Sequence, residues 1–338
     1  MTVADWLSDT VKSIQQDGVR GCKDALYELY LGTWRRVGRL YNYGEPIYER
    51  DWDVLIILDA CRSDLMAAVD SEYEFASTVS THSAASTSAE WMTKNFEPKE
   101  YRQAVEQTAY VTGNPFTDEI CFSHQCPDCG ATRERVPGAD CDECGNAAAP
   151  NRVPDHDFQI LDEVWQYGWD DGLGTIPPAP ITDRAITTWR DESPDQMIVH
   201  YMQPHHPFVG SEIQTSLSPE GFGEMGRESV WNLLRRGEVS KEAVWRDYVK
   251  NLEYVLDDVS RLLDNIDADR VVLTADHGNA MGELGLYGHY RDVPLGAMKR
   301  VPWCETSASN VQDYSPETTE RENNDDVVEE RLKDLGYM

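Results

Sequence analysis

Three short apolar runs in this sequence stop at side chains that bind metal ions or act as acids and bases. The runs are residues 54–58, 197–202 and 271–274. The polar side chains that follow them are Asp59, His205, His206, Asp276 and His277. Such runs are typical of buried parallel strands, and the ligand crevice of an open α/β sheet lies outside the carboxyl ends of its strands. We therefore expect one polar site where the three strands end.

Carboxylates and an imidazole at one point form a ligand set for a divalent cation. Asp59, Asp276 and His277 are the predicted ligands of a single catalytic cation, for which manganese, magnesium, calcium and zinc are all open. Such a cation orients a phosphate or sulfate ester and lowers the pKa of a coordinated hydroxyl. His205 and His289 are expected to be further ligands, to contact the charged oxygens or to protonate the leaving group. Taken singly, a strand-terminal aspartate is more often a turn or cap residue.

A hydroxyl-rich run covers residues 77–88 and contains Ser83. Thr87 and Glu90 form a capping-box pattern, which predicts a helix that begins inside this run. The amides and the positive dipole end of that helix would face the site, where they stabilise a serine or threonine nucleophile or a bound phosphate. For this stretch alone, a Ser/Thr-rich loop ending in an ordinary helix cap is the simpler interpretation.

Two Cys-x-x-Cys-Gly motifs, with eleven residues between Cys129 and Cys141, predict a zinc ribbon. Their thiolates belong to Cys126, Cys129, Cys141 and Cys144. Four cysteines leave no open coordination position, so structural zinc is favoured over catalytic zinc or a redox pair. Residues 119–150 should fold only with zinc bound, as an insertion in a catalytic domain, because the strand pattern resumes beyond them.

Strand and helix patterns alternate on both sides of this insertion. Residues 109–118 resemble a strand and turn, and the segment from residue 157 onward looks helical and then loop-like. A rigid proline-rich spacer at 177–180 precedes a helix at 181–190, and Lys241 to Asp264 resembles a long amphipathic helix. Residues 209–240 are expected to be a mobile loop or cap near the site. The alternation predicts an α/β fold, a mostly parallel sheet with helices on both faces.

The predicted domain organisation has three parts. Residues 1–50 form an N-terminal helical segment, residues 51–304 the catalytic domain, and residues 305–338 an acidic linker with a short helix from Val327 to Leu335. The segment Trp34 to Arg39 joins aromatic and basic residues, as membrane-surface helices do. An amphipathic helix packed on the domain is nevertheless the favoured interpretation.

Composition excludes broad classes of partner. The formal net charge is −31, from 61 acidic and 30 basic residues, and such a field repels nucleic acid and anionic membranes. A dispersed acidic surface is typical of proteins adapted to a salt-rich cytoplasm, where charge repulsion is screened. No signal pattern or membrane-spanning stretch is evident, so we expect a cytoplasmic protein without a transmembrane segment. The oligomeric state cannot be read from the sequence.

Four segments together resemble the alkaline phosphatase and sulfatase superfamily. Asp276-His277-Gly278 with the following Gly282-Glu283-Leu284-Gly285 and Gly288-His289 is similar to that family's Asp-His-Gly, Gly-Glu-His-Gly and Gly-His signature. Leu58–Asp64 looks like its first metal-ligand strand and Tyr201–Phe208 like its His-x-Pro-aromatic segment. Ser83-Ala84-Ala85-Ser86 matches the run around an alkaline phosphatase nucleophile. The whole pattern, with the inserted ribbon, resembles a haloarchaeal sulfatase-like subfamily.

The resemblance implies a metal-dependent phosphoryl, or sulfuryl, ester hydrolase or transferase that acts on a small-molecule, glycan or lipid ester. Ser83 would be its nucleophile and a ligand of the cation. Sulfatases convert a Cys or Ser in Cys/Ser-x-Pro-x-Arg to formylglycine, and this Pro and Arg do not follow Ser83, so the pattern is closer to phosphotransferases. A second acid beside Asp59 is replaced by Ala60, which favours one cation. The alternative function is a catalytically inactive scaffold that recruits a protein or glycan-assembly partner through its ribbon.

Overall fold

The structure is a computed structural model. It describes residues 18–69, 71–73, 77–117, 158–213, 229–311 and 314–317. The predicted zinc ribbon with Cys126, Cys129, Cys141 and Cys144, and the predicted C-terminal helix, lie outside these residues.

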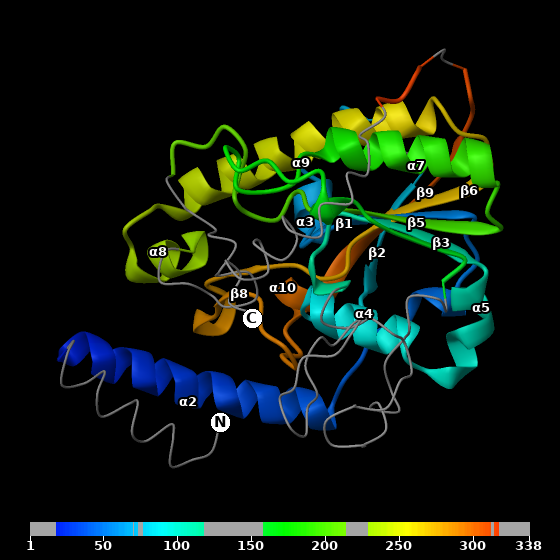
Figure 1. The fold of residues 1–338 in the computed structure, drawn as a ribbon. Coiled ribbons are helices and arrows are strands. Elements are labelled where there is room, and N and C mark those ends of the chain that lie inside the picture. Colours follow the sequence, from blue (N-terminus) through cyan, green and yellow to red (C-terminus); the bar gives the residue numbers. More distant parts are fainter. Residues whose placement is uncertain are drawn as a thin grey trace, which may run out of the picture.

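A seven-stranded sheet with the strand order β2-β9-β6-β1-β5-β3-β4 forms the centre of the molecule (Figure 1). The strands are β1 (Val54–Leu58), β2 (Ser77–His82), β3 (Thr108–Thr112), β4 (Ile160–Glu163), β5 (Gln196–Tyr201), β6 (Ala268–Thr274) and β9 (Arg300–Ala308). Strands β6, β1, β5, β3 and β4 are parallel, and β9 runs antiparallel to its neighbours β2 and β6. A separate hairpin joins β7 (Ala280–Met281) and β8 (Tyr287–Gly288). The predicted mostly parallel sheet is confirmed.

Helices cover both faces of this sheet, with α7 and α9 on one side and α4 and α5 on the other (Figure 1). The α-helices are α2 (Val19–Leu40), α3 (Ser63–Met66), α4 (Ser88–Phe96), α5 (Arg102–Glu106), α7 (Pro178–Glu192), α8 (Val230–Arg236), α9 (Lys241–Leu263) and α10 (Gly296–Lys299). Short 3-10 turns are η1 (Ile47–Glu49), η2 (Lys99–Tyr101), η4 (Val164–Gln166) and η6 (Glu283–Gly285). Among the helices in the described ranges, none combines the length and apolarity needed to cross a bilayer.

The two layers of helices explain why the first apolar run is continuous. Val54, Ile56 and Leu58 of β1 pack in the cluster that includes α7 and α9, whereas Leu55 and Ile57 pack in the cluster that includes α4. All five side chains are fully buried. A strand that is covered on both faces needs apolar residues at every position, so only its end is available for polar side chains.

Three expectations about the elements are wrong. Helix α7 begins at Pro178, inside the run predicted as a rigid spacer, because a proline in the first helical turn loses no intrahelical hydrogen bond. Residues 160–163, expected to be helical, form strand β4 beside β3. Residues 209–240, expected to be a loop or cap, contain helix α8.

Strand β9 also runs to Ala308, four residues past the predicted end of the domain at residue 304. Its final residues were read as linker because Glu305, Thr306 and Ser307 are polar. Strand β9 pairs antiparallel with both of its neighbours, and antiparallel strands can carry polar side chains on a solvated face; here Glu305 pairs with Ser77 of β2 and with Val272 of β6. The pairing with β6 therefore extends the folded body beyond the sequence-based boundary.

The N-terminal helix α2 packs on the loops that follow β6. Leu31 is buried there, with Tyr27 and Trp34 partly buried in the same cluster. A Cβ atom at Gly38 would overlap the backbone oxygen of Asp292, so glycine is required for this close approach. The expected packing of the N-terminal helix on the domain is confirmed for residues 19–40.

We expect Gly38→Ala to destabilise the attachment of α2 because its new methyl group meets backbone rather than a flexible side chain. Gly32→Ala, in the same helix, has nothing within 4 Å of the added atom and should stabilise the chain by about 0.5–1 kcal/mol. Thermal unfolding of the two variants measures the difference. Equal melting temperatures would contradict the tight packing at Gly38.

Candidate metal centre and active site

Three adjacent strands bring their ligands together at one edge of the sheet. Asp59 directly follows β1, Asp276 follows β6, and His200 is the penultimate residue of β5. Ile57 of β1 is in register with both His200 and Thr274, so the three side chains lie side by side. All three are buried, as is His277 beside them. The predicted convergence of strand ends is thus present.

The distances in this cluster suit a common ion. His277 Nε2 lies 3.6 Å from Asp59 Oδ1 and 3.5 Å from Asp276 Oδ2. His200 Nε2 lies 3.8 Å from Asp59 Oδ2 and 4.0 Å from Asp276 Oδ2. One ligand atom from each of Asp59, His200 and Asp276 falls within 4.8 Å of the others. Ligand bonds of about 2.0–2.2 Å to one cation span separations of this size.

In each carboxylate, one oxygen accepts hydrogen bonds and the other oxygen has no hydrogen-bond partner among the described residues. Asp59 Oδ2 accepts from Asn114 Nδ2 at 2.8 Å, and Asp276 Oδ1 accepts from the backbone N–H groups of Ala60 and His277 at 3.0 and 2.8 Å. Asp59 Oδ1, Asp276 Oδ2 and His200 Nε2 are buried without a hydrogen-bond partner. Buried polar atoms are normally paired, so three orphaned acceptors facing one point fit a bound cation.

The two imidazoles are oriented by their other ring nitrogens. His277 Nδ1 lies 3.1 Å from the carbonyl oxygen of Gly278, which assigns the proton to Nδ1 and leaves Nε2 as an acceptor toward the site. His200 Nδ1 lies 2.8 Å from the hydroxyl of Tyr110. Burial lowers the pKa of His200 to about 4, so this ring is neutral, as a metal ligand must be.

Two carboxyl groups share this buried space. Burial and the neighbouring charge of Asp276 raise the pKa of Asp59 well above its usual value. Like charges in a low-dielectric interior disfavour joint ionisation. A divalent cation removes that conflict, so the residues present fit such a group.

Ser88, the first residue of α4, supplies a hydroxyl to the cluster. Its Oγ lies 3.3 Å from Asp59 Oδ2 and 3.3 Å from His277 Nε2. The residue before it, Thr87, caps the helix by accepting a hydrogen bond from the backbone N–H of Glu90 at 3.3 Å. The predicted helix start is confirmed, and its amide end faces the metal ligands.

Ser83, the nucleophile predicted from sequence, lies elsewhere in the same loop. Its Oγ donates to the backbone oxygen of Asp276 at 2.5 Å and accepts from the N–H of Ala85 at 3.1 Å. The first bond ties the loop to the end of β6, and the second lies within the loop itself. Neither of these bonds involves a carboxylate oxygen or a ring nitrogen of the cluster, whereas the Ser88 hydroxyl contacts both Asp59 Oδ2 and His277 Nε2.

The remaining predicted histidines form a second layer beside the cluster. The ring centroids of His289 and His277 are 4.3 Å apart, and those of His289 and His205 are 5.3 Å apart. Asn279 holds His289 through a 2.7 Å bond between Oδ1 and Nδ1. His205 and His289 are both partly exposed, so they form the open rim of the site. His206 lies behind His205, buried against Trp231.

Sequence reasoning missed His200, Ser88 and Asn114. His200 is the only histidine inside the apolar run 197–202, a polar interruption that could have identified it. Ser88 follows the predicted cap at Thr87, so the capping box itself pointed to the first hydroxyl of the helix. Asn114 carries no such signal, because an asparagine after a strand is usually a turn residue.

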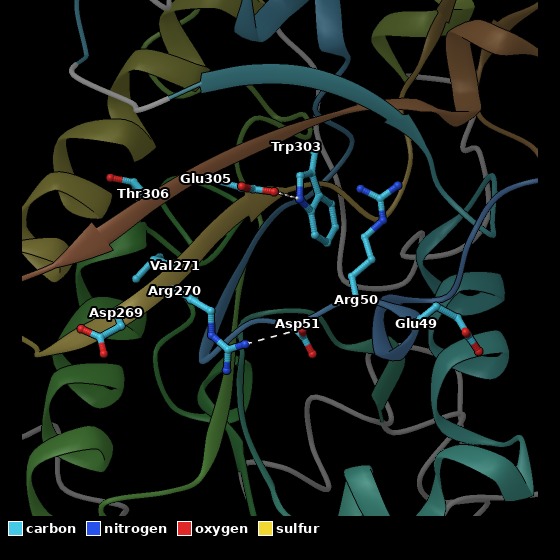
Figure 2. A pocket seen from close by; sticks show the side chains of 9 residues that line it. All are labelled: Glu49, Arg50, Asp51, Asp269, Arg270, Val271, Trp303, Glu305 and Thr306. Atoms are coloured by element: carbon cyan, nitrogen blue, oxygen red, sulfur yellow. Dashed lines mark hydrogen bonds and ion pairs between the residues drawn. The ribbon is translucent and has the colours of Figure 1, made fainter.

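A hollow at the opposite end of the sheet is a different kind of feature (Figure 2). It is lined by Glu49, Arg50, Asp51, Asp269, Arg270, Val271, Trp303, Glu305 and Thr306. Arg50 stacks over Trp303 and pairs with Glu45, and Arg270 pairs with Asp53. Because its cations are already paired with acids of the chain, this hollow does not resemble an anion site.

No protein-family model matches the chain, and no curated protein matches it. Solved structures are similar in fold. The soluble domain of lipooligosaccharide phosphoethanolamine transferase A from Neisseria meningitidis is 11% identical, with 76% of each chain covered and a TM-score of 0.40. The C-terminal periplasmic domain of EcEptC from Escherichia coli, in a complex with zinc, is 11% identical, with 80% of this chain and 77% of that chain covered and a TM-score of 0.44.

A candidate sulfatase, yidJ from Bacteroides fragilis, is 15% identical, with 78% of this chain and 69% of that chain covered and a TM-score of 0.36. At these identities and TM-scores, what the site can do is inferred from its own geometry.

We expect manganese to stabilise the metal-free chain, because the orphaned oxygens would coordinate the ion. At a manganese concentration a hundredfold above Kd, the free energy of unfolding should rise by about 2.7 kcal/mol. Manganese prefers oxygen and imidazole ligands over the thiolates of the predicted ribbon. Asp59→Asn with Asp276→Asn should abolish the response. Asp51→Asn with Asp269→Asn, in the opposite hollow, is the matched control and should retain it. Thermal unfolding with and without manganese gives the readout, and an equal response of both double variants would refute the site.

Proposed function

We propose that this chain is a metal-dependent hydrolase or transferase of phosphate esters, with sulfate esters as the alternative substrate, and that Ser88 is its nucleophile. One observation carries the proposal. The orphaned acceptors of Asp59, His200 and Asp276 face one point, and a helix N-terminal hydroxyl contacts the same group. A cation site joined to a serine at a helix N-terminus is the arrangement that phosphoryl transfer needs.

The residues that would hold the cation are Asp59, His200, Asp276 and His277. When bound, a divalent cation would neutralise charge on the ester oxygens and favour the ionised serine. The chain itself supplies the geometry, because Asn114 and the amide of Ala60 fix the carboxylate orientations from behind. Such supporting contacts hold ligands in place before the substrate arrives.

Ser88 is placed to attack phosphorus. Its hydroxyl donates to Asp59 Oδ2, so the proton leaves along that hydrogen bond as the Oγ–phosphorus bond forms. The bond between phosphorus and the leaving oxygen breaks at the same step, giving a phosphoserine and the released alcohol once a proton is supplied. Water or an acceptor alcohol then attacks the phosphoserine, which returns Ser88 and distinguishes a hydrolase from a transferase.

His205 and His289 lie where the leaving group would emerge. Both rings are neutral, since burial lowers the pKa of His205 to about 4 and that of His289 well below its usual value. A neutral imidazole donates one N–H to a charged oxygen. We assign them to the non-bridging oxygens and the leaving group of the ester.

The sequence around Ser88 favours phosphate over sulfate. In Ser88-Ala89-Glu90-Trp91-Met92, neither the proline nor the arginine of the formylglycine motif is present. Ser88 therefore remains a hydroxyl nucleophile. Contact between Asp59, Asp276 and His277 also supports an enzyme rather than an inactive scaffold, which would not need to hold these groups together. From the sequence alone, we also propose that the protein works in a salt-rich cytoplasm. The four cysteines of the predicted ribbon would hold a structural zinc ion.

We expect Ser88→Ala to lower nitrophenol release from a nitrophenyl phosphate mono- or diester by about 10³-fold or more, because no nucleophile remains. The assay uses high salt with manganese. Ser83→Ala is the matched control in the same loop and tests the sequence-based choice directly. Loss of activity in Ser83→Ala with full activity in Ser88→Ala would reverse the assignment. Turnover of nitrophenyl sulfate at a rate equal to that of the phosphate would overturn the substrate preference.

His289→Ala should lower kcat by about 10²-fold to 10⁴-fold, because the ester loses an oxygen contact or a proton donor. Its effect on manganese stabilisation should be small, since the ring lies outside the orphaned-acceptor cluster. Initial rates and thermal unfolding of the same preparation separate the two effects. A lost manganese response with an unchanged rate would make His289 a structural ligand instead.

A further inference from the structure

Helix α2 has two faces, and within the described ranges only one of them packs against the rest of the fold. Tyr27, Leu31, Trp34 and Gly38 face the loops after β6 and pack there. On the outer side, large apolar residues lie at positions spaced for one helical face. They are Leu26, Leu29, Tyr30, Val37 and Leu40, all of which are exposed. Positions three, four and seven apart share a face of a helix, so these residues form an outer stripe, with the exposed Thr33 between its two halves.

The outer stripe is unusually exposed for such residues. Leu26 is 62% exposed, Leu29 53% and Leu40 79%. Helix α2 runs along the outside of the molecule, away from the sheet (Figure 1). Contiguous exposed apolar residues of this kind mark an interaction surface rather than a chance exposure.

The stripe continues onto a neighbouring loop. Leu284 in η6 is 58% exposed, and its carbonyl oxygen accepts a 2.8 Å hydrogen bond from the Tyr30 hydroxyl. Its backbone adopts φ 50°, a left-handed conformation that is strained for leucine. The structure therefore holds a large apolar side chain outward beside α2 in spite of two costs, exposure and backbone strain.

The charge of α2 is opposite to that of the chain. Residues 19–40 contain five basic and two acidic residues, whereas the whole chain has 30 basic and 61 acidic. Lys23 and Arg36 flank the stripe on its two sides, both exposed, and neither has an ion-pair partner in the part of the chain that the structure describes. The two acids, Asp24 and Glu28, are four residues apart and lie on the side of the helix opposite the outer stripe.

We propose that the outer face of α2, together with Leu284, docks on the surface of an anionic lipid bilayer. The leucines would enter the boundary between head groups and acyl chains while Lys23 and Arg36 meet anionic head groups. Tyr30 and Tyr41 are also exposed, and tyrosine is enriched at the boundary between water and a bilayer. The proposal concerns location and does not depend on the reaction proposed above.

A second copy of the chain fits this face less well. Both sides of the stripe carry a free cation, so pairing two α2 helices would bring like charges together. An anionic bilayer meets the cations of α2 directly, and salt screens its repulsion of the acidic body within a few ångströms at high concentration.

Docking in this pose would place the catalytic rim near the bilayer. Tyr27 contacts Tyr290 through their hydroxyls at 3.1 Å, and Arg39 pairs with Asp292 at 2.9 Å. Tyr290 and Asp292 lie one and three residues after His289 in the chain. The helix that would touch lipid is therefore fixed to the segment that carries a rim histidine.

The test is sedimentation of the full chain with phosphatidylcholine vesicles, with and without phosphatidylglycerol, at low and high salt. We expect binding to the anionic vesicles. The variant Leu26→Ser, Leu29→Ser, Leu40→Ser should lower the partition coefficient by at least about a hundredfold, because the inserted apolar area is lost. Lys23→Gln with Arg36→Gln should lower it by about thirtyfold at low salt and by less at high salt.

The matched control is Val79→Ser with Val311→Ser, which removes side chains that are 58% and 73% exposed elsewhere on the molecule. This control should bind like the wild type, and all variants should keep the wild-type melting temperature. Three results would overturn the proposal. These are no binding of the wild type to either vesicle, equal binding of the stripe variant, or a wild-type dimer that the stripe variant converts to a monomer without any vesicle binding.

Discussion

Two carboxyl groups, Asp59 and Asp276, are buried side by side at the ends of β1 and β6, and much of the structure compensates for this juxtaposition. The chain assigns fixed donors to one oxygen of each and leaves the other oxygen toward a shared point. One donor, the N–H of Ala60, is available because Ala60 adopts φ 64°. Left-handed backbone at a non-glycine residue costs about 1–3 kcal/mol and persists where the surroundings enforce it. The strained backbone of Ala60 therefore points its N–H group at the carboxylate of Asp276.

The sequence predicted the part of this site that depends on strand ends. Apolar runs that stop at Asp59 and at Asp276-His277 are informative because a fully buried strand can place polar groups only where it ends. The parallel sheet then places neighbouring ends together whatever the detailed packing is. The sheet and the carboxylate pair were therefore predictable from local patterns, even though β4, β9 and α8 were not.

Residues whose position depends on register were not predictable in the same way. His200 lies inside β5, and only its pairing with Ile57 of β1 shows that it reaches the carboxylates. The choice between Ser83 and Ser88 depends on where the chain turns between β2 and α4. Four residues of irregular backbone separate Ser83 from Ser88, and similarity of a short motif does not fix how those residues fold. The cap at Thr87 was the physical signal, since a hydroxyl at the first helical position must face what the helix end faces.

The two layers of the site are mechanically joined through α9. Tyr248 of that helix donates to the carbonyl oxygen of Ala60 and accepts from Asn279 Nδ2 at 3.1 Å. Asn279 in turn holds His289 through its Oδ1 atom. One chain of hydrogen bonds therefore runs from the strained turn at Ala60, which orients Asp276, to a histidine of the rim. Because Ala60, Tyr248 and Asn279 are buried and each is hydrogen-bonded to the next, the ligand cluster and the rim are positioned as a single unit rather than as two independent loops.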